Sequence, residues 1–292
     1  RDPPPEMRVL RLLRGLPRIP ARTMMFGVTA GVTSATIGAG AFAEGQGSSA
    51  NKPPEWYMKP WTSFQKEPAM ADQVPGYDRV HVLRRTFYSV HLMGRLRDAS
   101  SSREQFIDAA RKLSVMILNE ALGMLPHTPR SVKTPVDNAT YVTFDMPDPH
   151  QELCVVHILR AASSMSDVVT REYPEIPVGT ILIQRNEETA EPVMFYSKLP
   201  PDVEKRRVIL VDPMLATGGS IKEAIATIRK AGVLEQNILV VSIVAAPEGV
   251  DAVLKANPTV RILVGEMDRG LNDKKYIVPG LGDFGDRFYG TT

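Results

Sequence analysis

The chain has 292 residues, a net charge of +2 and one cysteine, Cys154. That length allows one or two domains and a sizeable core. The near-neutral balance argues against nucleic-acid binding through bulk positive charge, and a single cysteine excludes an intrachain disulfide framework. The 5 histidines never recur at i, i+4 spacing, so the sequence carries no zinc pattern.

Residues 1–22 are rich in arginine and poor in acidic residues, of which they hold only Asp2 and Glu6. Arginine-rich, acid-poor N-terminal segments are typical of mitochondrial targeting. The absence of an initial methionine fits the removal of a presequence.

Residues 23–43 carry no charged side chain, and a helix needs ~20 such residues to span a bilayer. Gly27 and Gly31 form the G-x-x-x-G pattern of closely packed membrane helices. A signal peptide ending at 41–43 and a flexible segment rich in Gly, Ala and Thr are the alternatives. We expect a transmembrane helix, and the arginines before it predict an N-terminus in the matrix or cytoplasm.

Residues 44–78 have the composition of a linker, with many Pro, Gly and Ser residues. Trp56, Tyr57 and Trp61 lie within it. These aromatic side chains suit a membrane interface, a partner protein or the chain's own globular domain, and the sequence does not decide among them.

The globular domain spans 79–292. A short strand near Val80, a helix over 88–96, a helix over 106–121 that begins with a capping box at Ser102, and a hairpin around 139–144 are expected first. Apolar strands then alternate with helical segments, which predicts a parallel sheet covered on both faces. The expected strands are 153–158, 179–183, 208–211, 238–244 and 260–264.

One strand-to-helix junction in this domain has the composition of an anion site. The strand 208–211 is followed by Asp212, the small-residue turn 217–220 and a helix with one apolar face. Unpaired N–H groups at a helix N-terminus bind phosphate, and glycines allow its close approach. The turn lacks the Gly-Lys-Ser/Thr of a Walker loop and the spacing of a dinucleotide fingerprint. A capped turn without a ligand is the structural alternative.

The run from Asp212 to Ser220 resembles the phosphoribosyl-pyrophosphate (PRPP) loop of uracil phosphoribosyltransferases. Four further segments resemble that family in its order and spacing, and together they cover about 80–292: they are 158–161, 185–189, 245–249 and 276–287. The resemblance implies a type I phosphoribosyltransferase α/β fold, a mainly parallel sheet flanked by helices with a C-terminal hood. It also implies conversion of uracil and PRPP into UMP and pyrophosphate, with Mg²⁺ bound to PRPP and without nucleic acid as a partner.

The resemblance also assigns site residues. Arg160, Asp212 and Asp283 are the expected catalytic residues. Uracil is expected to meet backbone groups of Ile277 and Gly282, together with Asp283 and Phe284. The expected PRPP-binding residues are Arg160, Arg185, Asp212, Pro213, Met214, Leu215, Ala216, Thr217, Gly218, Gly219, Ser220 and Asp283. Arginine suits pyrophosphate because guanidinium pairs bidentately with its oxygens.

The chain departs from the family pattern at His157 and Ala162, where relatives often have Pro and Gly, and at Phe284, where bacterial relatives have a small residue. A methyl group at Ala162 is expected either to crowd the pyrophosphate loop or to exclude a backbone geometry with φ > 0. The main hypothesis is an active, membrane-anchored enzyme of the mitochondrial inner membrane or of another organelle membrane. The alternative is an accessory subunit of an inner-membrane complex (respiratory or ATP synthase) with weak or lost catalysis. Homo-oligomers are also expected, because the family forms them.

Overall fold

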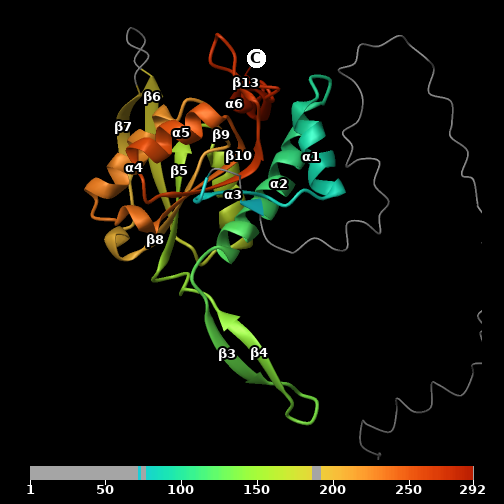
Figure 1. Cartoon of the computed structure of the whole chain (residues 1–292), viewed down its shortest axis with the longest axis vertical. Coiled ribbons are helices and arrows are strands. Elements are labelled where there is room, and N and C mark those ends of the chain that lie inside the picture. The colour runs from blue at the N-terminus through green and yellow to red at the C-terminus, as the bar shows by residue number, and fades with distance from the viewer. Residues whose placement is uncertain (1–71, 74–76, 186–191, 292) are drawn as a thin grey trace, which may run out of the picture. The chain divides into compact units, whose positions relative to one another are not determined.

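The computed structural model describes residues 72–73, 77–185 and 192–291 (Figure 1). The expected transmembrane helix 23–43, the segment 1–22 and most of the linker lie outside these residues. Among the residues that are described, no helix combines the length and the apolar character that crossing a bilayer requires.

Nine strands of the described chain form one sheet, built around a parallel centre. The chain alternates buried strands with helices, as the hydrophobic pattern predicts. The strand order is β1 (Asp72–Gln73), β2 (Val80–Val82), β11 (Arg261–Met267), β10 (Ile238–Ala245), β8 (Arg207–Val211), β5 (Leu153–Leu159), β6 (Val178–Arg185) and β7 (Pro192–Lys198), and β9 (Met214–Leu215) pairs with β10.

The expected mainly parallel sheet is confirmed, with antiparallel strands only at its two edges in the described chain. β2, β11, β10, β8, β5 and β6 run parallel, whereas β1 and β7 pair antiparallel with their neighbours. The sequence pattern missed β7. The side chains of 193–196 are all exposed, so this strand has no alternation of buried and exposed residues.

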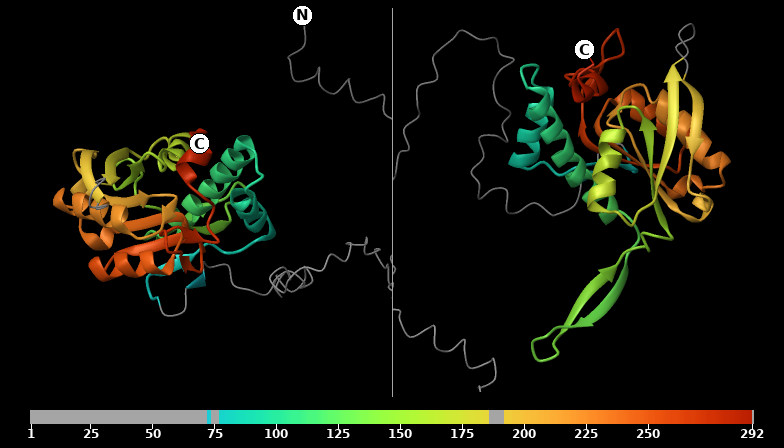
Figure 2. Two further views of the ribbon diagram at one scale, coloured as in Figure 1. Left: turned by 90° about the horizontal axis from the view of Figure 1, so that it is seen from above. Right: turned by 180° about the vertical axis from the view of Figure 1, so that it is seen from behind.

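Alternate residues of the central strands enter two separate cores. Ile209 and Val211 of β8 pack under α1 (Phe87–Arg97), α2 (Arg103–Gly123) and α3 (Ser163–Glu172). Val208 and Leu210 pack instead under α4 (Gly219–Lys230) and α5 (Pro247–Ala256). The two helix layers lie on opposite faces of the sheet (Figure 2). Continuous apolar strands therefore follow from burial on both faces.

The predicted capping box at Ser102 is confirmed, and the structure shows a second one at Thr86. Thr86 and Ser102 each cap a helix, and their side chains accept from the N–H three residues on. Two short 3₁₀ turns, Val203–Lys205 and Glu235–Asn237, lead into β8 and β10. The expected hairpin is confirmed as β3 (Thr128–Lys133) and β4 (Thr140–Asp145), which project away from the sheet (Figure 1).

The C-terminal hood consists of β12 (Gly270–Leu271), β13 (Ile277–Val278) and α6 (Phe284–Tyr289). It lies at the end of the sheet where the parallel strands finish (Figure 1). In the sheet, β5 lies between β6 and β8, so the chain passes from β5 to a neighbour on one side and later returns to the other side. This is a topological switch point, where open α/β sheets bind their ligands.

Candidate functional site

The loop after β8 forms a small hollow with unpaired backbone donors. Asp212 and 214–221 line a space of about 40 Å³. In the described part of the chain, no carbonyl or side chain accepts from the N–H groups of Thr217, Gly218 and Gly219. The first bond inside α4 runs from Lys222 N–H to Gly218 O over 2.9 Å. Free N–H groups and the positive end of the helix dipole make this hollow suitable for a phosphate group.

β10 and α5 hold the loop from outside. Ala246 N–H donates to Leu215 O over 2.9 Å. Gly218 has φ of 76°, and a Cβ on it would lie 2.8 Å from Gly249 O. A Cβ on Gly249 would lie 2.2 Å from Ala216 O. Gly249, which the sequence offered only as part of a family motif, is therefore the residue that lets α5 approach the loop.

Asp212 lies at the base of this hollow, directly after β8. Its N–H donates to Val241 O over 3.1 Å, which fixes its backbone against β10. Burial raises the pKa of its carboxyl to about 7, and the Met214 N–H that points to the carboxylate only partly offsets this rise. Near neutral pH this side chain therefore exists both as a proton donor and as an acceptor for hydroxyl groups.

Arg160 follows β5 and so lies across the switch point from Asp212. Its side chain is 55% exposed and forms an ion pair of 3.0 Å with Asp286 of α6. Arg185 ends β6, but its side chain lies outside the described structure. Ala162 has φ of −71°, which any residue adopts, and its methyl group is buried in the core. The substitution there does not strain the backbone.

The hood contributes the segment that resembles the uracil-reading loop. Asp283 caps α6, where its Oδ1 accepts from Asp286 N–H over 2.9 Å. Gly282 has φ of 80°. The side chains of Ile277 and Phe284 are 5% and 1% exposed, and the Phe284 ring packs edge-on against Phe106. Contacts of Ile277 or Phe284 with a ligand would therefore come from their backbone atoms, since both side chains serve the core.

Sequence reasoning missed the charged cluster that holds this loop. Arg97 Nη2 pairs with Asp268 Oδ1 at 2.6 Å and with Glu266 Oε2 at 2.8 Å. Arg97 Nη1 donates to Gly280 O over 2.8 Å, and Gly280 N–H donates to Asp268 Oδ2 over 2.9 Å. Arg287 Nη1 donates to Leu281 O over 2.7 Å. The partners are far apart in the sequence, so only the position of Asp268 after a strand hinted at a role.

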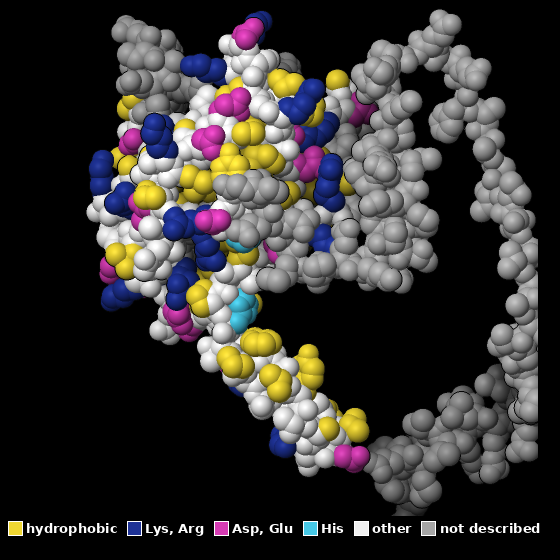
Figure 3. Space-filling view, in the orientation of Figure 1, with side chains coloured by type: hydrophobic (Ala, Val, Ile, Leu, Met, Phe, Trp, Pro, Cys, Tyr) yellow, Lys and Arg dark blue, Asp and Glu magenta, His cyan; other side chains and the backbone are white. Residues whose placement is uncertain are grey.

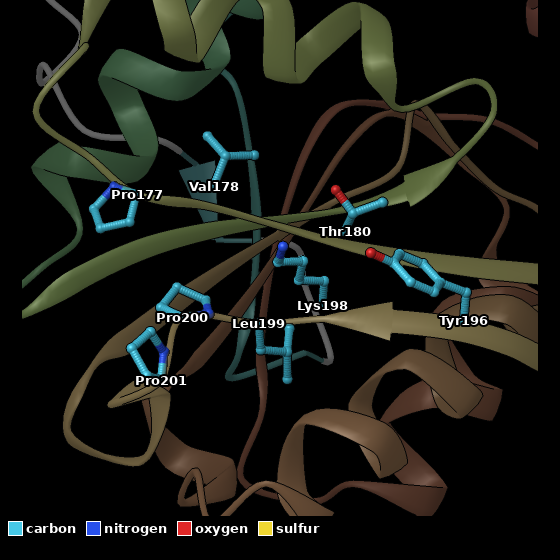
Figure 4. A pocket seen from close by; sticks show the side chains of 8 residues that line it. All are labelled: Pro177, Val178, Thr180, Tyr196, Lys198, Leu199, Pro200 and Pro201. Carbon is cyan, nitrogen blue, oxygen red and sulfur yellow. The ribbon is translucent and has the colours of Figure 1, made fainter.

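A larger hollow of about 490 Å³ lies elsewhere, beside β6 and β7 (Figure 4). Val178 and Thr180 belong to the amino-terminal part of β6, and Thr180 pairs with Lys198 of β7. The motif residues follow the carboxyl ends of the strands, at the opposite end of the sheet. None of them lines this hollow, so its size does not make it the candidate site.

Comparison with known proteins agrees with this geometry. A family model described as uracil phosphoribosyltransferase matches residues 83–291. A uracil phosphoribosyltransferase of Dictyostelium discoideum is 39% identical over 216 residues, which are 73% of this chain and 97% of that protein. One from Deinococcus radiodurans is 41% identical over 201 residues, 69% of this chain and 93% of that protein. The solved structure of the AQ2163 protein from Aquifex aeolicus covers 73% of this chain and 99% of its own, with 33% identity and a TM-score of 0.63.

Proposed function

Because this chain belongs to the uracil phosphoribosyltransferase family, we propose that it transfers the phosphoribosyl group of PRPP to uracil and releases UMP and pyrophosphate. The observation that carries the proposal is the hollow at 212–221, with free N–H donors beside a carboxylate at the switch point of the sheet. A ligand that fits both features carries a phosphate and hydroxyl groups, as the ribose 5-phosphate part of PRPP does.

The two ends of PRPP bind to different groups of residues. The N–H groups of Thr217, Gly218 and Gly219 bind the 5-phosphate, and Asp212 accepts hydrogen bonds from the ribose hydroxyls. Arg160 binds the pyrophosphate from the neighbouring strand end, joined by Arg185. These roles explain why the motifs follow separate parallel strands that finish at one end of the sheet.

In the reaction, the bond between the ribose C1′ and the pyrophosphate oxygen breaks, and a bond between C1′ and a ring nitrogen of uracil forms. The electron pair of the broken bond leaves with pyrophosphate, and the proton of the uracil nitrogen passes to the departing pyrophosphate or to water. Positive charge develops on the ribose ring, as in glycoside cleavage. Carboxylates such as Asp212 and Asp283 stabilise that charge electrostatically.

Mg²⁺ is expected to arrive with PRPP. Among the described residues, no group of three or more His, Cys, Asp or Glu side chains is arranged to hold a metal ion. Mg²⁺ retains most of its waters and binds polyphosphate oxygens together with one or two carboxylates. Mg²⁺ would therefore be held mainly by the oxygens of PRPP and by water, while Asp212 and Asp283 keep the roles given above.

Uracil recognition is assigned to the hood. Backbone groups of Ile277 and Gly282 would pair with the amide edge of the base, beside Asp283. Cytosine presents a different donor and acceptor pattern and would leave buried polar groups without partners. We therefore expect strong discrimination between the two bases.

Purified full-length chain with uracil, PRPP and Mg²⁺ tests the proposal. UMP should form, cytosine should give no nucleotide, and Asp212→Asn should lose PRPP binding in a calorimetric titration. Absence of UMP from a folded protein that binds PRPP would contradict the proposed reaction. Unchanged PRPP binding by Asp212→Asn would contradict the proposed site.

A membrane tether in the N-terminal segment remains a proposal that rests on the sequence of 1–43. A tether at the mitochondrial inner membrane, or at another organelle membrane, predicts that the full-length chain stays in the pellet after carbonate extraction. Release into the supernatant would contradict it. The alternative role as an accessory subunit of a membrane complex gains no support from the relatives, which are named as enzymes.

Exposed apolar side chains on the hairpin support the expected self-association. Apolar side chains gather on the projecting hairpin (Figure 3), where Tyr141, Val142 and Phe144 are each more than half exposed. Exposed apolar groups of this kind mark contact surfaces in soluble proteins. Sedimentation analysis should show a species larger than one chain, and a strictly monomeric protein would contradict the expectation.

A further inference from the structure

The C-terminal segment holds one side of the Arg160 guanidinium. Arg160 Nη2 donates to Asp286 Oδ1 over 3.0 Å and to Thr291 Oγ1 over 3.3 Å. Thr291 Oγ1 in turn donates to Asp286 Oδ1 over 2.6 Å. The ring of Tyr289 lies 5.4 Å from the guanidinium carbon, and its hydroxyl donates to Arg160 O over 3.3 Å. Three residues of one short segment thus contact a single arginine.

The other side of the guanidinium is free. In the described chain, Nε and Nη1 of Arg160 donate to no protein group, and the side chain is 55% exposed. The contacts through Nη2 therefore orient the guanidinium. They leave the N–H groups of Nε and Nη1, which lie on different edges of the guanidinium, for separate oxygens of an anion.

The same C-terminal segment also lies beside Asp283, in the loop assigned to uracil. A Cβ on Gly285 would lie 3.3 Å from Asp283 Oδ1 and 3.4 Å from Arg160 Nη2, so Asp283 and Arg160 flank one point of α6. Asp283 belongs to the loop assigned to uracil, whereas Arg160 belongs to the pyrophosphate side. The start of α6 therefore lies between the two substrate positions.

We propose that Asp286, with the hydroxyl of Thr291, is a positioning residue that orients Arg160 for the pyrophosphate of PRPP, so that the C-terminal segment completes the PRPP site. This inference rests on the proposed function. A flexible arginine loses rotamer freedom when it binds an anion, and a side chain already held in place loses less. The ion pair therefore strengthens pyrophosphate binding without touching the substrate.

The opposite role is a competitor. A carboxylate that merely occupies Arg160 would have to be displaced by PRPP and would add repulsion toward its phosphates. The two roles predict opposite signs for the removal of Asp286. A positioning residue weakens PRPP binding when it is lost, whereas a competitor strengthens binding when it is lost.

Asp286→Ala is the first variant to measure. The change keeps the backbone groups that bond to Asp283, Gly290 and Thr291. We expect the affinity for Mg²⁺–pyrophosphate, titrated by calorimetry into the full-length chain, to fall by roughly tenfold. The KM for PRPP should rise by a similar factor, and the KM for uracil should change less than about twofold. Asp286→Asn should recover part of the loss because it keeps the shape and one acceptor.

A double-mutant cycle shows whether Asp286 acts through Arg160. In the Arg160→Ala background, Asp286→Ala should reduce affinity by less than about twofold further, because the group that it orients is absent. Asp108→Asn is the matched control, since Asp108 also forms an exposed pair, at 2.8 Å with Lys112. This control should leave the affinity unchanged.

Tighter binding by Asp286→Ala, or an equal loss in both backgrounds, would overturn the inference. If a thermal melt shows that Asp286→Ala does not fold, Thr291→Val replaces it. This variant should weaken the binding of Mg²⁺–pyrophosphate by about twofold, because it removes one weak hydrogen bond to Arg160. Unchanged binding by folded Thr291→Val would then count against the inference. Pyrophosphate binding needs no turnover, so it can be measured even in a protein that makes no UMP. Absence of UMP would refute the proposed function, while the binding data would still decide the role of Asp286.

Discussion

The proposed phosphate loop at 212–220 and the proposed uracil loop at 277–283 are held in place in different ways. The phosphate loop is shaped by its own backbone and by the adjoining strand β10, with Gly249 allowing α5 to pack close. The uracil loop is held by charged side chains from other elements, above all Arg97 and Asp268. A loop built from local backbone carries its signal in one contiguous motif, while a loop held by distant side chains does not.

The largest expected loss of stability comes from replacing Arg97, which donates to the proposed uracil loop. Arg97→Met leaves the carboxylate of Asp268, only 3% exposed, without its cation, whereas Glu266 keeps its ion pair of 3.0 Å with Arg85. We expect the free energy of unfolding to fall by about 3 kcal/mol in urea denaturation. The KM for uracil should rise more than the KM for PRPP, because Gly280 O loses its donor.

Arg95→Met is the matched control on the same helix. Arg95 forms a looser pair of 3.5 Å with Asp108, and both side chains are well exposed. Its loss should cost less than about 1 kcal/mol. If the two variants lost equal free energy of unfolding, the uracil loop would not depend on Arg97. The contrast between the two loops would then be wrong.

A smaller effect on stability is expected when the phosphate loop is crowded. The methyl group of Gly249→Ala would lie 2.2 Å from Ala216 O, so either α5 or the loop must move. We expect a loss of about 1–3 kcal/mol and a rise mainly in the KM for PRPP. This is the opposite selectivity to Arg97→Met and can be read from the same steady-state assay.

Gly94→Ala provides the comparison for that substitution. Gly94 lies inside α1, and a Cβ there meets nothing within 4 Å. The change should stabilise the protein by about 0.5–1 kcal/mol, since alanine has the better helix propensity. A destabilised Gly94→Ala would show that added methyl groups harm this fold generally, and the Gly249 result would lose its meaning.

The smallest expected effect is a dependence of stability on pH that originates at Asp212. Burial raises its pKa to about 7 in the folded chain, against ~3.9 in the unfolded chain. The folded state therefore binds this proton more tightly, so the contribution is fully present below ~pH 4 and is lost as the pH rises through about 7. Asp212→Asn should remove a decline on the order of 1–2 kcal/mol between about pH 6 and about pH 8.

Urea denaturation at the two pH values measures this decline, and Asp108→Asn should retain it. An identical pH dependence in Asp212→Asn and in the original chain would assign the proton to another group. The hollow at the phosphate loop would then be better solvated than its burial implies.

The sequence by itself determined the parallel core and the phosphate loop. Val208–Val211, the small residues that follow and the apolar face of α4 are contiguous, and their propensities agree with the fold. The family motifs placed Arg160 and Asp212 at strand ends for the same reason. The boundaries of β7 were not predictable, because an exposed antiparallel edge strand lacks the burial pattern on which the prediction depends.

Only the tertiary structure decided how the hood is held. Arg97 and Asp268 are 171 positions apart, and Arg160 and Asp286 are 126 apart. Nothing in local periodicity pairs such residues, because their contact depends on how the helices pack on the sheet. The same reason placed Phe284 in the core although the motif assigned it to the base. Backbone geometry is set by neighbours in the sequence, whereas the partner of a charged side chain is set by the fold as a whole.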